Sequence, residues 1–138
     1  MQKSTQELLH RLKEIDNIQV FLDENEQELL NETVHSYLAG LLTEKKLTAA
    51  IVAQRSGQGD YVYKVFQGKR KASRDILLAI AIGMNLNLAE AQLLLRIAQT
   101  ARLDPRNRRD SAIIYALNNE SQIETTNDIL CDIGEATL

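Results

Sequence analysis

The sequence predicts an all-α protein, and three observations lead to this class. Its 138 residues include one proline and only 4% aromatic residues, and the many Leu, Ile, Ala, Glu, Gln and Arg residues favour helices over strands. Apolar residues recur three and four positions apart, without the alternation of a strand. Polar capping residues and glycines stand at the ends of these runs. We expect seven or eight helices.

An acidic helical extension is predicted for residues 1–32. Ser4 and Glu7 have the spacing of a capping box, in which each side chain accepts a hydrogen bond from the other residue's backbone N–H. The apolar residues that follow recur at helical spacing: Leu8, Leu9, Leu12 and Ile15. A second short amphipathic helix contains Ile18, Phe21 and Leu22. We interpret residues 23–28 as a solvated turn and helix start.

Residues 33–99 predict a central domain of five helices. An apolar stripe over residues 34–42 ends at the polar run 43–46. Thr48 and Ser73 are good N-caps for the helices that follow them. Gly57 can take the left-handed conformation that ends a helix, and Gly68 ends the next one, expected over residues 59–67. The last helix of this domain is expected over residues 88–98.

Residues 100–138 predict a C-terminal helical extension that serves in packing or dimerisation. Asp104-Pro105 has the pattern of a helix start, and a last helix is expected to begin at Thr125 or Thr126 and end at Gly134. The apolar residues of these two helices are Ile113, Ile114, Leu117, Ile129, Leu130 and Ile133. They exceed what a small central domain needs, which predicts a two-fold homodimer. We favour the C-terminal pair as its interface, because the acidic N-terminal helices would place like charges opposite each other.

Charge is distributed unevenly along the chain. Residues 1–43 hold three Lys and Arg against eight Asp and Glu, residues 44–74 hold eight against two, and residues 75–138 hold five against nine. The segment charges of −5, +6 and −4 add up to the net −3 of the chain. A polyanion would therefore meet a positive field in the middle of the sequence.

The central segment also has the pattern of two short helices joined by a tight turn. Residues 47–57 read LTAAIVAQRSG, and residues 60–70 read DYVYKVFQGKR. Two helices that cross at a steep angle need a small residue at their contact, which Ala53 supplies, and a turn residue, which Gly57 supplies. The second helix is apolar on one side and polar on the other, as a helix that enters the roughly 12 Å wide major groove must be.

This pattern resembles the Xre or lambda-repressor-like family of helix-turn-helix transcription regulators over residues 34–98. In that family the recognition helix ends in a turn like Gly68-Lys69-Arg70, and a serine like Ser73 begins the next helix. The whole chain resembles a small Gram-positive subgroup with N- and C-terminal helical extensions, which the runs YVY (61–63), GKR (68–70), SRD (73–75), RRD (108–110), II (113–114) and TN (126–127) carry, together with Leu130. The stretch from Gly57 to Tyr61 is one residue shorter than the family's turn.

The resemblance implies which residues meet DNA. The candidates for reading bases are Gln58, Asp60, Tyr63, Lys64 and Gln67. Glutamine pairs with adenine and lysine reaches guanine acceptors, whereas Asp60 either accepts from a cytosine amino group or caps the helix. The candidates for phosphate contacts are Thr48, Tyr61, Lys69, Arg70, Lys71, Ser73 and Arg74.

Other features of the sequence have simpler interpretations. His10 and His35 lack Cys or carboxylate partners at ligand spacing, so no metal site is predicted. Cys131 is interpreted as a small core residue, and a single cysteine fits a cytoplasmic location. Tyr115 and the group Arg106, Arg108, Arg109 and Asp110 are interpreted as part of a surface salt-bridge network with a helix terminus, with a ligand or partner patch as the alternative. No run of membrane-spanning length occurs.

These observations predict a regulator that binds a specific site on double-stranded DNA and represses by occupying it. Catalytic motifs and cofactor-binding motifs are absent from the sequence, so neither an enzyme nor a cofactor is expected. The alternative is an interaction adaptor, such as an antitoxin-like component, whose acidic N-terminal helices hold a partner protein. The fold alone does not separate the two functions.

Overall fold

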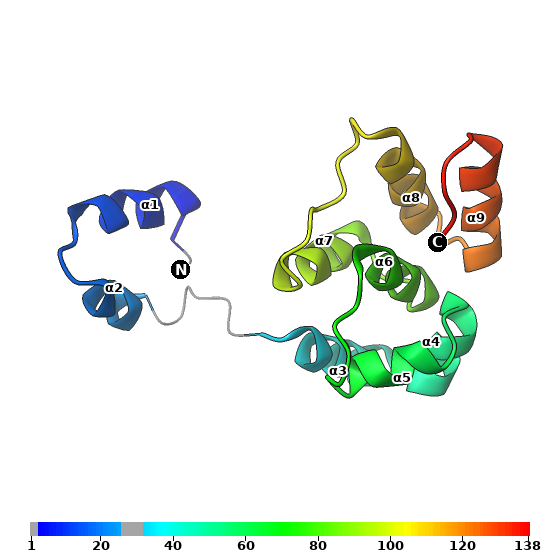
Figure 1. The fold of residues 1–138 in the computed structure, drawn as a ribbon, viewed down its shortest axis with the longest axis horizontal. Helices are drawn as coiled ribbons and strands as arrows, with labels where there is room; N and C mark the ends of the chain where they lie inside the picture. The colour runs from blue at the N-terminus through cyan, green and yellow to red at the C-terminus, as the bar shows by residue number, and fades with distance from the viewer. Residues whose placement is uncertain (1–2, 26–31) are drawn as a thin grey trace. The chain divides into compact units, whose positions relative to one another are not determined.

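The computed structural model describes residues 3–25 and 32–138, and all regular structure in these residues is helical (Figure 1). They contain nine helices, more than the seven or eight predicted, and the all-α class is confirmed. The chain divides into two compact units, residues 1–31 and residues 32–138. The predicted C-terminal extension is thus part of the same unit as the central domain.

The first unit consists of α1 (Thr5–Glu14) and α2 (Ile18–Glu24). Ser4 caps α1 as predicted, because its hydroxyl oxygen accepts from the Glu7 N–H at 3.1 Å. The Arg11 guanidinium joins the two helices by donating to both carboxylate oxygens of Glu24, at 3.0 and 2.8 Å. The turn expected over residues 23–28 lies partly outside the described residues.

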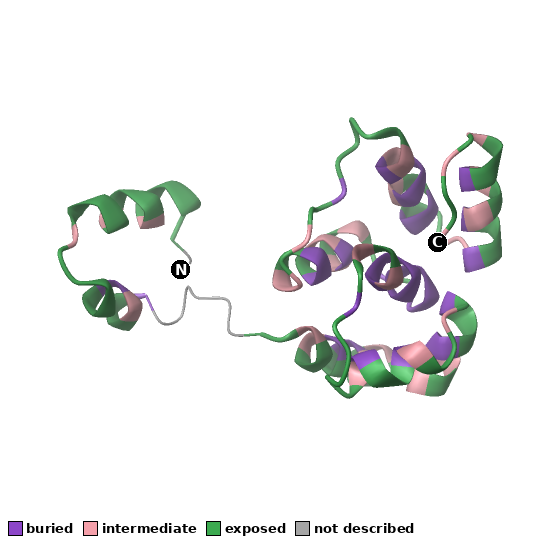
Figure 2. Ribbon diagram, in the orientation of Figure 1, coloured by how far each residue is buried: buried purple, intermediate pink, exposed green. Residues whose placement is uncertain are grey.

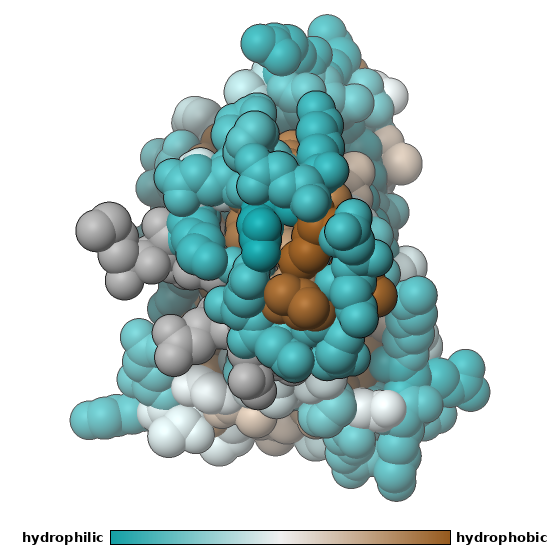
Figure 3. All heavy atoms as spheres, turned by 90° about the vertical axis from the view of Figure 1, so that its left-hand side faces the viewer, coloured by the Kyte–Doolittle hydropathy of each residue, from teal (hydrophilic) through white to brown (hydrophobic). Residues whose placement is uncertain are grey.

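Apolar side chains of the first unit remain largely open to solvent. Phe21 is the one buried hydrophobic residue among the described residues of this unit, and α1 buries none. Figure 3 shows apolar atoms exposed between hydrophilic ones on the face turned toward the viewer. The exposed large hydrophobic residues of the first unit are Leu9, Leu12, Ile18 and Val20. Two helices this short have too little apolar surface to build a core of their own.

The second unit is built around one central helix. Its helices are α3 (Val34–Lys45), α4 (Ala49–Ser56), α5 (Asp60–Phe66), α6 (Arg74–Gly83), α7 (Leu88–Ile97), α8 (Arg108–Asn118) and α9 (Ile123–Asp132). Helices α4, α7, α8 and α9 all pack against α6. Residues 77–83 of α6 are therefore all buried, and this helix is largely purple in Figure 2. A helix that is apolar all round is expected at such a place.

The helix ends predicted in the central domain are confirmed. The Thr48 hydroxyl accepts from the Ile51 N–H at 3.2 Å, and the Ser73 hydroxyl accepts from the Ile76 N–H at 3.3 Å. Gly57 ends α4 with φ +71°, a conformation that costs glycine little and other residues more. These signals are local, since each joins residues at most three positions apart.

Two predicted helix starts in the C-terminal part are wrong. Helix α8 begins at Arg108 with Asn107 as its N-cap, and not at Pro105. Asp104 instead closes a turn: its carboxylate accepts from the Arg106 N–H and its carbonyl from the Asn107 N–H, both at 2.9 Å. Helix α9 begins at Ile123, before Thr125 and Thr126, because burial of the Ile123 side chain extends the helix backward.

Burial in α8 and α9 corrects two further expectations. Cys131 is exposed and is not a core residue, since its neighbour Leu130 occupies the inner face of α9. The apolar residues that were expected to supply a dimer interface pack within the unit itself: Ile113, Leu117 and Leu130 are buried, and Ile114, Ile129 and Ile133 are half-buried. Little of their apolar surface is therefore left exposed for a dimer interface. Over the described ranges, no helix combines the length and apolar character needed to cross a bilayer.

Candidate nucleic-acid interface

The turn between α4 and α5 is held by a buried hydroxyl. The Ser56 side chain is fully buried, donates to the Ala53 carbonyl at 3.3 Å and accepts from the Gln58 N–H at 3.3 Å. The Gly59 N–H also bonds the Ala53 carbonyl, at 3.3 Å. The three residues from Gly57 to Gly59 therefore suffice to connect the helices. The backbone N–H groups of Gln58 and Gly59 have hydrogen-bond partners although the turn is short.

Close packing beneath this turn sets the position of α4 on α6. A Cβ added to Gly83, the last residue of α6, would lie 2.9 Å from the Ser56 backbone nitrogen and 3.1 Å from its Cα. Only glycine allows the backbones to approach this closely. The sequence did not predict this contact, because it joins residues 27 positions apart.

Helix α5 is buried on one side and open on the other. Val62 and Val65 are fully buried, whereas the predicted base-reading residues Tyr63, Lys64 and Gln67 are exposed. Asp60 is also exposed; Gly59 is the N-cap, and no side-chain capping bond forms there. The capping role considered for Asp60 is therefore wrong. Gln58 lies half-buried in the turn rather than on the helix.

A basic loop, residues 68–72, follows α5 and folds back against its end. The backbone N–H groups of Lys69 and Arg70 both donate to the Lys64 carbonyl, at 2.9 and 3.3 Å. The Tyr61 hydroxyl donates to the Lys71 carbonyl at 3.1 Å. These bonds hold the basic loop beside the exposed face of α5. Tyr61, expected to contact phosphate, thus has a bond to the loop as well.

Gly68 fixes the start of the basic loop against α3. Its φ of +71° is left-handed, and a Cβ there would lie 2.8 Å from Nδ1 of His35. Any other residue would be strained in this conformation and would also displace the imidazole. The ring of His35 therefore packs against the loop, a contact that the sequence did not predict.

The cations of this surface form no ion pair within residues 3–25 and 32–138. Lys69, Arg70 and Lys71 are exposed, as is Lys64. Among the described residues, the seven ion pairs of the chain leave out all four of these cations. By contrast, Lys45 of the same basic segment pairs with Glu90 at 3.0 Å. Four cations without an ion-pair partner among the described residues thus lie on α5 and the basic loop.

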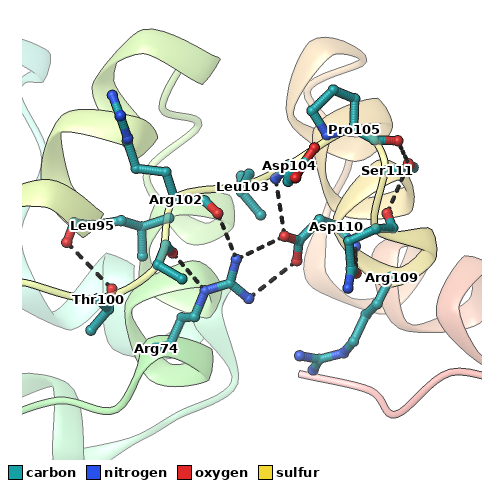
Figure 4. Close-up of polar contacts among 12 residues, drawn as sticks. Arg74, Leu95, Thr100, Arg102, Leu103, Asp104, Pro105, Arg109, Asp110 and Ser111 are labelled. Carbon is teal, nitrogen blue, oxygen red and sulfur yellow. Dashed lines mark hydrogen bonds and ion pairs between the residues drawn. The ribbon is translucent and has the colours of Figure 1, made fainter.

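Arg74 does not belong to this free surface, which corrects its expected phosphate role. Its guanidinium donates to both oxygens of the buried Asp110 carboxylate, at 3.1 and 2.9 Å (Figure 4). It also donates to the carbonyls of Ala101 at 2.8 Å and Arg102 at 3.2 Å. The N–H groups of the guanidinium are therefore used within the protein and are not free for a phosphate. The buried Asp110 carboxylate requires such a cationic partner.

The predicted salt-bridge network is present in part: Arg108 and Arg109 form ion pairs, Asp110 pairs with Arg74, and Arg106 has no ion pair among the described residues. Arg109 pairs with Asp75 at 2.8 Å and donates to the Ala136 carbonyl at 2.9 Å. Arg108 donates to the Ile133 carbonyl at 3.0 Å. The hydrogen bond to Asp75 raises the pKa of Arg109 above its ordinary value. The network ties α8 to the start of α6 and to the C-terminal residues.

In the part of the chain that the structure describes, no three His, Cys, Asp or Glu residues are grouped to hold a metal ion.

Thr48 and Ser73 lie exposed at the starts of α4 and α6, on either side of α5 in sequence, and each keeps a hydroxyl proton to donate. The exposed surface of α5, the basic loop and these two helix starts thus forms the candidate interface. Comparison of the chain with protein-family models, curated proteins and solved structures gave no match.

Proposed function

We propose that the second unit binds a specific site on double-stranded DNA, with α4 and α5 as a helix-turn-helix and α5 in the major groove. The observation that carries this proposal is the composition of one surface. The exposed side of α5 and its C-cap present Tyr63, Lys64 and Gln67 next to the cations of the basic loop, which have no ion-pair partner among the described residues. A groove-binding helix needs readers of base edges and a positive border for the phosphates on the same surface.

The proposed division of labour follows from chemistry. Lys64 and Gln67 read bases, because lysine donates to guanine acceptors and glutamine pairs with adenine. Lys69, Arg70 and Lys71 contact phosphates, and Thr48 and Ser73 add donors at helix N-termini, where the helix dipole favours anions. Arg74 is removed from this set by its ion pair with Asp110. Bound at a promoter, such a protein represses by occupying the site.

The experiment that tests the function is selection of duplexes from a random pool on the immobilised full chain. The recovered sequence is then titrated by fluorescence anisotropy beside a scrambled duplex at several salt concentrations. We expect specific affinity at least a thousandfold above nonspecific affinity. Lys69→Ala provides the interface variant, and Arg106→Ala is the matched control, since Arg106 is exposed outside the interface. An unenriched pool together with equal affinity of both variants for all duplexes would refute DNA recognition.

A second candidate function is protein binding by the first unit, as in an interaction adaptor. The observation that favours it is the exposure of Leu9 and Leu12, three positions apart on α1, in an acidic segment. A basic partner with an apolar stripe fits such a surface. A Leu9→Gln, Leu12→Gln double variant would lose the partner and keep DNA affinity. A partner held equally well by this variant would exclude the first unit as the binding site.

A further inference from the structure

A cavity of about 320 Å³ lies in the second unit where three segments meet. They are the start of α3, the basic loop and the C-terminal end of α7, which can be located in Figure 1. The volume is at the lower end of the range for small-molecule sites. The cavity is partly open to solvent, so a ligand can enter without opening the fold.

The lining combines apolar residues with two basic side chains and a histidine. The apolar lining residues include Val34, Val65, Ala72 and Ile97, and His35, Arg70 and Lys71 also line the cavity. No carboxylate lines the cavity. A ligand with an apolar body would be desolvated against the apolar residues, and the positive charges of Arg70 and Lys71 would attract an anionic group. A cationic ligand would be repelled.

Two other cavities of the second unit do not offer this combination. One of about 400 Å³ is lined by Arg74 and Arg109, but these side chains are already paired with Asp110 and Asp75. Another, of about 380 Å³, is lined by Glu120 and Glu124 as well as Arg55. The cations of the first cavity have no ion-pair partner among the described residues, which leaves their charge available to a ligand.

We propose that the cavity bordered by His35, Arg70 and Lys71 binds a small organic acid with an apolar body and one carboxylate. Arg70 and Lys71 are also proposed phosphate contacts, so the bound acid competes with DNA for them. This regulatory consequence rests on the proposed function. Binding of the acid itself does not, because the cavity and its charges exist in the free protein.

The first experiment titrates the free full-length protein with 1-naphthoate, followed by the backbone amide signals of residues 34–35, 68–72 and 97–99 in NMR spectra. The neutral 1-naphthamide has the same apolar body and is the matched ligand. We expect saturable binding of the acid, about tenfold tighter than that of the amide, since a bond between charged groups is stronger than a neutral one. Absence of saturable binding, or equal affinity for the two compounds, overturns the proposal.

The second experiment locates the site with two variants and a control. Ala98→Leu fills the cavity, which Ala98 also lines, without changing any charge, and should abolish binding of naphthoate. Arg70→Gln should weaken it about tenfold, whereas Arg106→Gln should leave it unchanged. Circular dichroism and the thermal midpoint confirm that each variant is folded. Unchanged affinity of the folded Ala98→Leu protein would place the acid elsewhere and overturn the assignment.

A DNA titration separates this proposal from the proposed function. Naphthoate should lower the DNA affinity of the natural protein and leave that of Ala98→Leu unaffected, because this variant keeps every DNA-contacting residue. Saturable binding of naphthoate by a protein that binds no DNA would support the site and refute the function. Specific DNA binding by a protein that does not bind naphthoate would support the function and refute the site.

Discussion

Arg74 and Asp110, 36 residues apart, form a two-pronged ion pair that joins the first turn of α6 to the first turn of α8. The same carboxylate also accepts from the Asp104 N–H at 3.0 Å. Together with the pair of Arg109 and Asp75, this pair connects α8 to the start of α6, which follows the basic loop. It holds Ser73 and the start of α6 in place beside the proposed phosphate contacts.

Arg74→Ala should lower stability rather than change the electrostatics of DNA binding. The substitution leaves the Asp110 carboxylate, whose side chain is 7% exposed, without its cation, and we expect a loss of about 2–4 kcal/mol in the free energy of unfolding. Urea denaturation measures the loss, and Arg106→Ala is the exposed control. Unchanged stability together with a smaller salt dependence of DNA binding would return Arg74 to the phosphate-contacting residues.

Lys69→Ala and Arg70→Ala should each weaken binding to specific and random duplexes alike, because phosphates carry no sequence information. Each substitution should also reduce the slope of log affinity against log salt concentration by about one. Anisotropy titrations at four or five salt concentrations give the slope. A slope equal to that of the unsubstituted protein would mean that these side chains do not face the DNA backbone.

Lys64→Ala and Gln67→Ala should instead affect specificity. Each is expected to cost roughly 1–3 kcal/mol at the preferred site while nonspecific affinity is kept, since only base edges distinguish the two kinds of DNA. Parallel titrations with preferred and scrambled duplexes measure the difference. Tyr61→Phe is the control for specificity. It removes the hydrogen bond to the Lys71 carbonyl and leaves the exposed face of α5 unchanged, so the ratio of specific to nonspecific affinity should stay the same. Equal losses on both duplexes would show that α5 does not read sequence.

The sequence predicts well what neighbouring residues decide. The caps at Thr48 and Ser73 and the left-handed end at Gly57 depend on residues within three positions, so the helices around the candidate interface were located correctly. The sidedness of α5 likewise follows from its own apolar spacing. Local chemistry thus accounts for the all-α class and for the exposed face of the candidate site.

What the sequence failed to predict depends on distant residues. Arg74 resembles a surface cation until Asp110, on another helix, is placed beside it. Cys131 has apolar neighbours in sequence, but the packing of α9 buries Leu130 and leaves Cys131 outside. Tertiary contacts decide these cases, and they also create the cavity beside Arg70 from segments more than 20 residues apart.

The contact of Gly83 with Ser56 predicts opposite effects for two glycine substitutions. Gly83→Ala should destabilise the protein by about 1–3 kcal/mol, because its Cβ would press on the α4 backbone 2.9 Å away. Gly40→Ala, in the interior of α3 with nothing within 4 Å of the added Cβ, should stabilise it by about 0.5–1 kcal/mol. Thermal and urea denaturation measure both. A stabilising Gly83→Ala would disprove the close approach of α4 and α6.

The last prediction is that the protein binds DNA as a two-fold dimer. One recognition helix reads too few base pairs for selectivity, and paired half-sites lie roughly 34–36 Å apart in proteins that solve this by symmetry. The inner faces of α8 and α9 are used within the unit, but Tyr115 of α8 is 60% exposed, more than any other large hydrophobic side chain of the described residues. Light scattering should give twice 15.6 kDa, and Tyr115→Glu should give a monomer that binds a palindromic site much more weakly. Leu93→Glu, at an exposed position of α7, is the control. A natural protein that is monomeric and protects a single half-site would contradict the dimer.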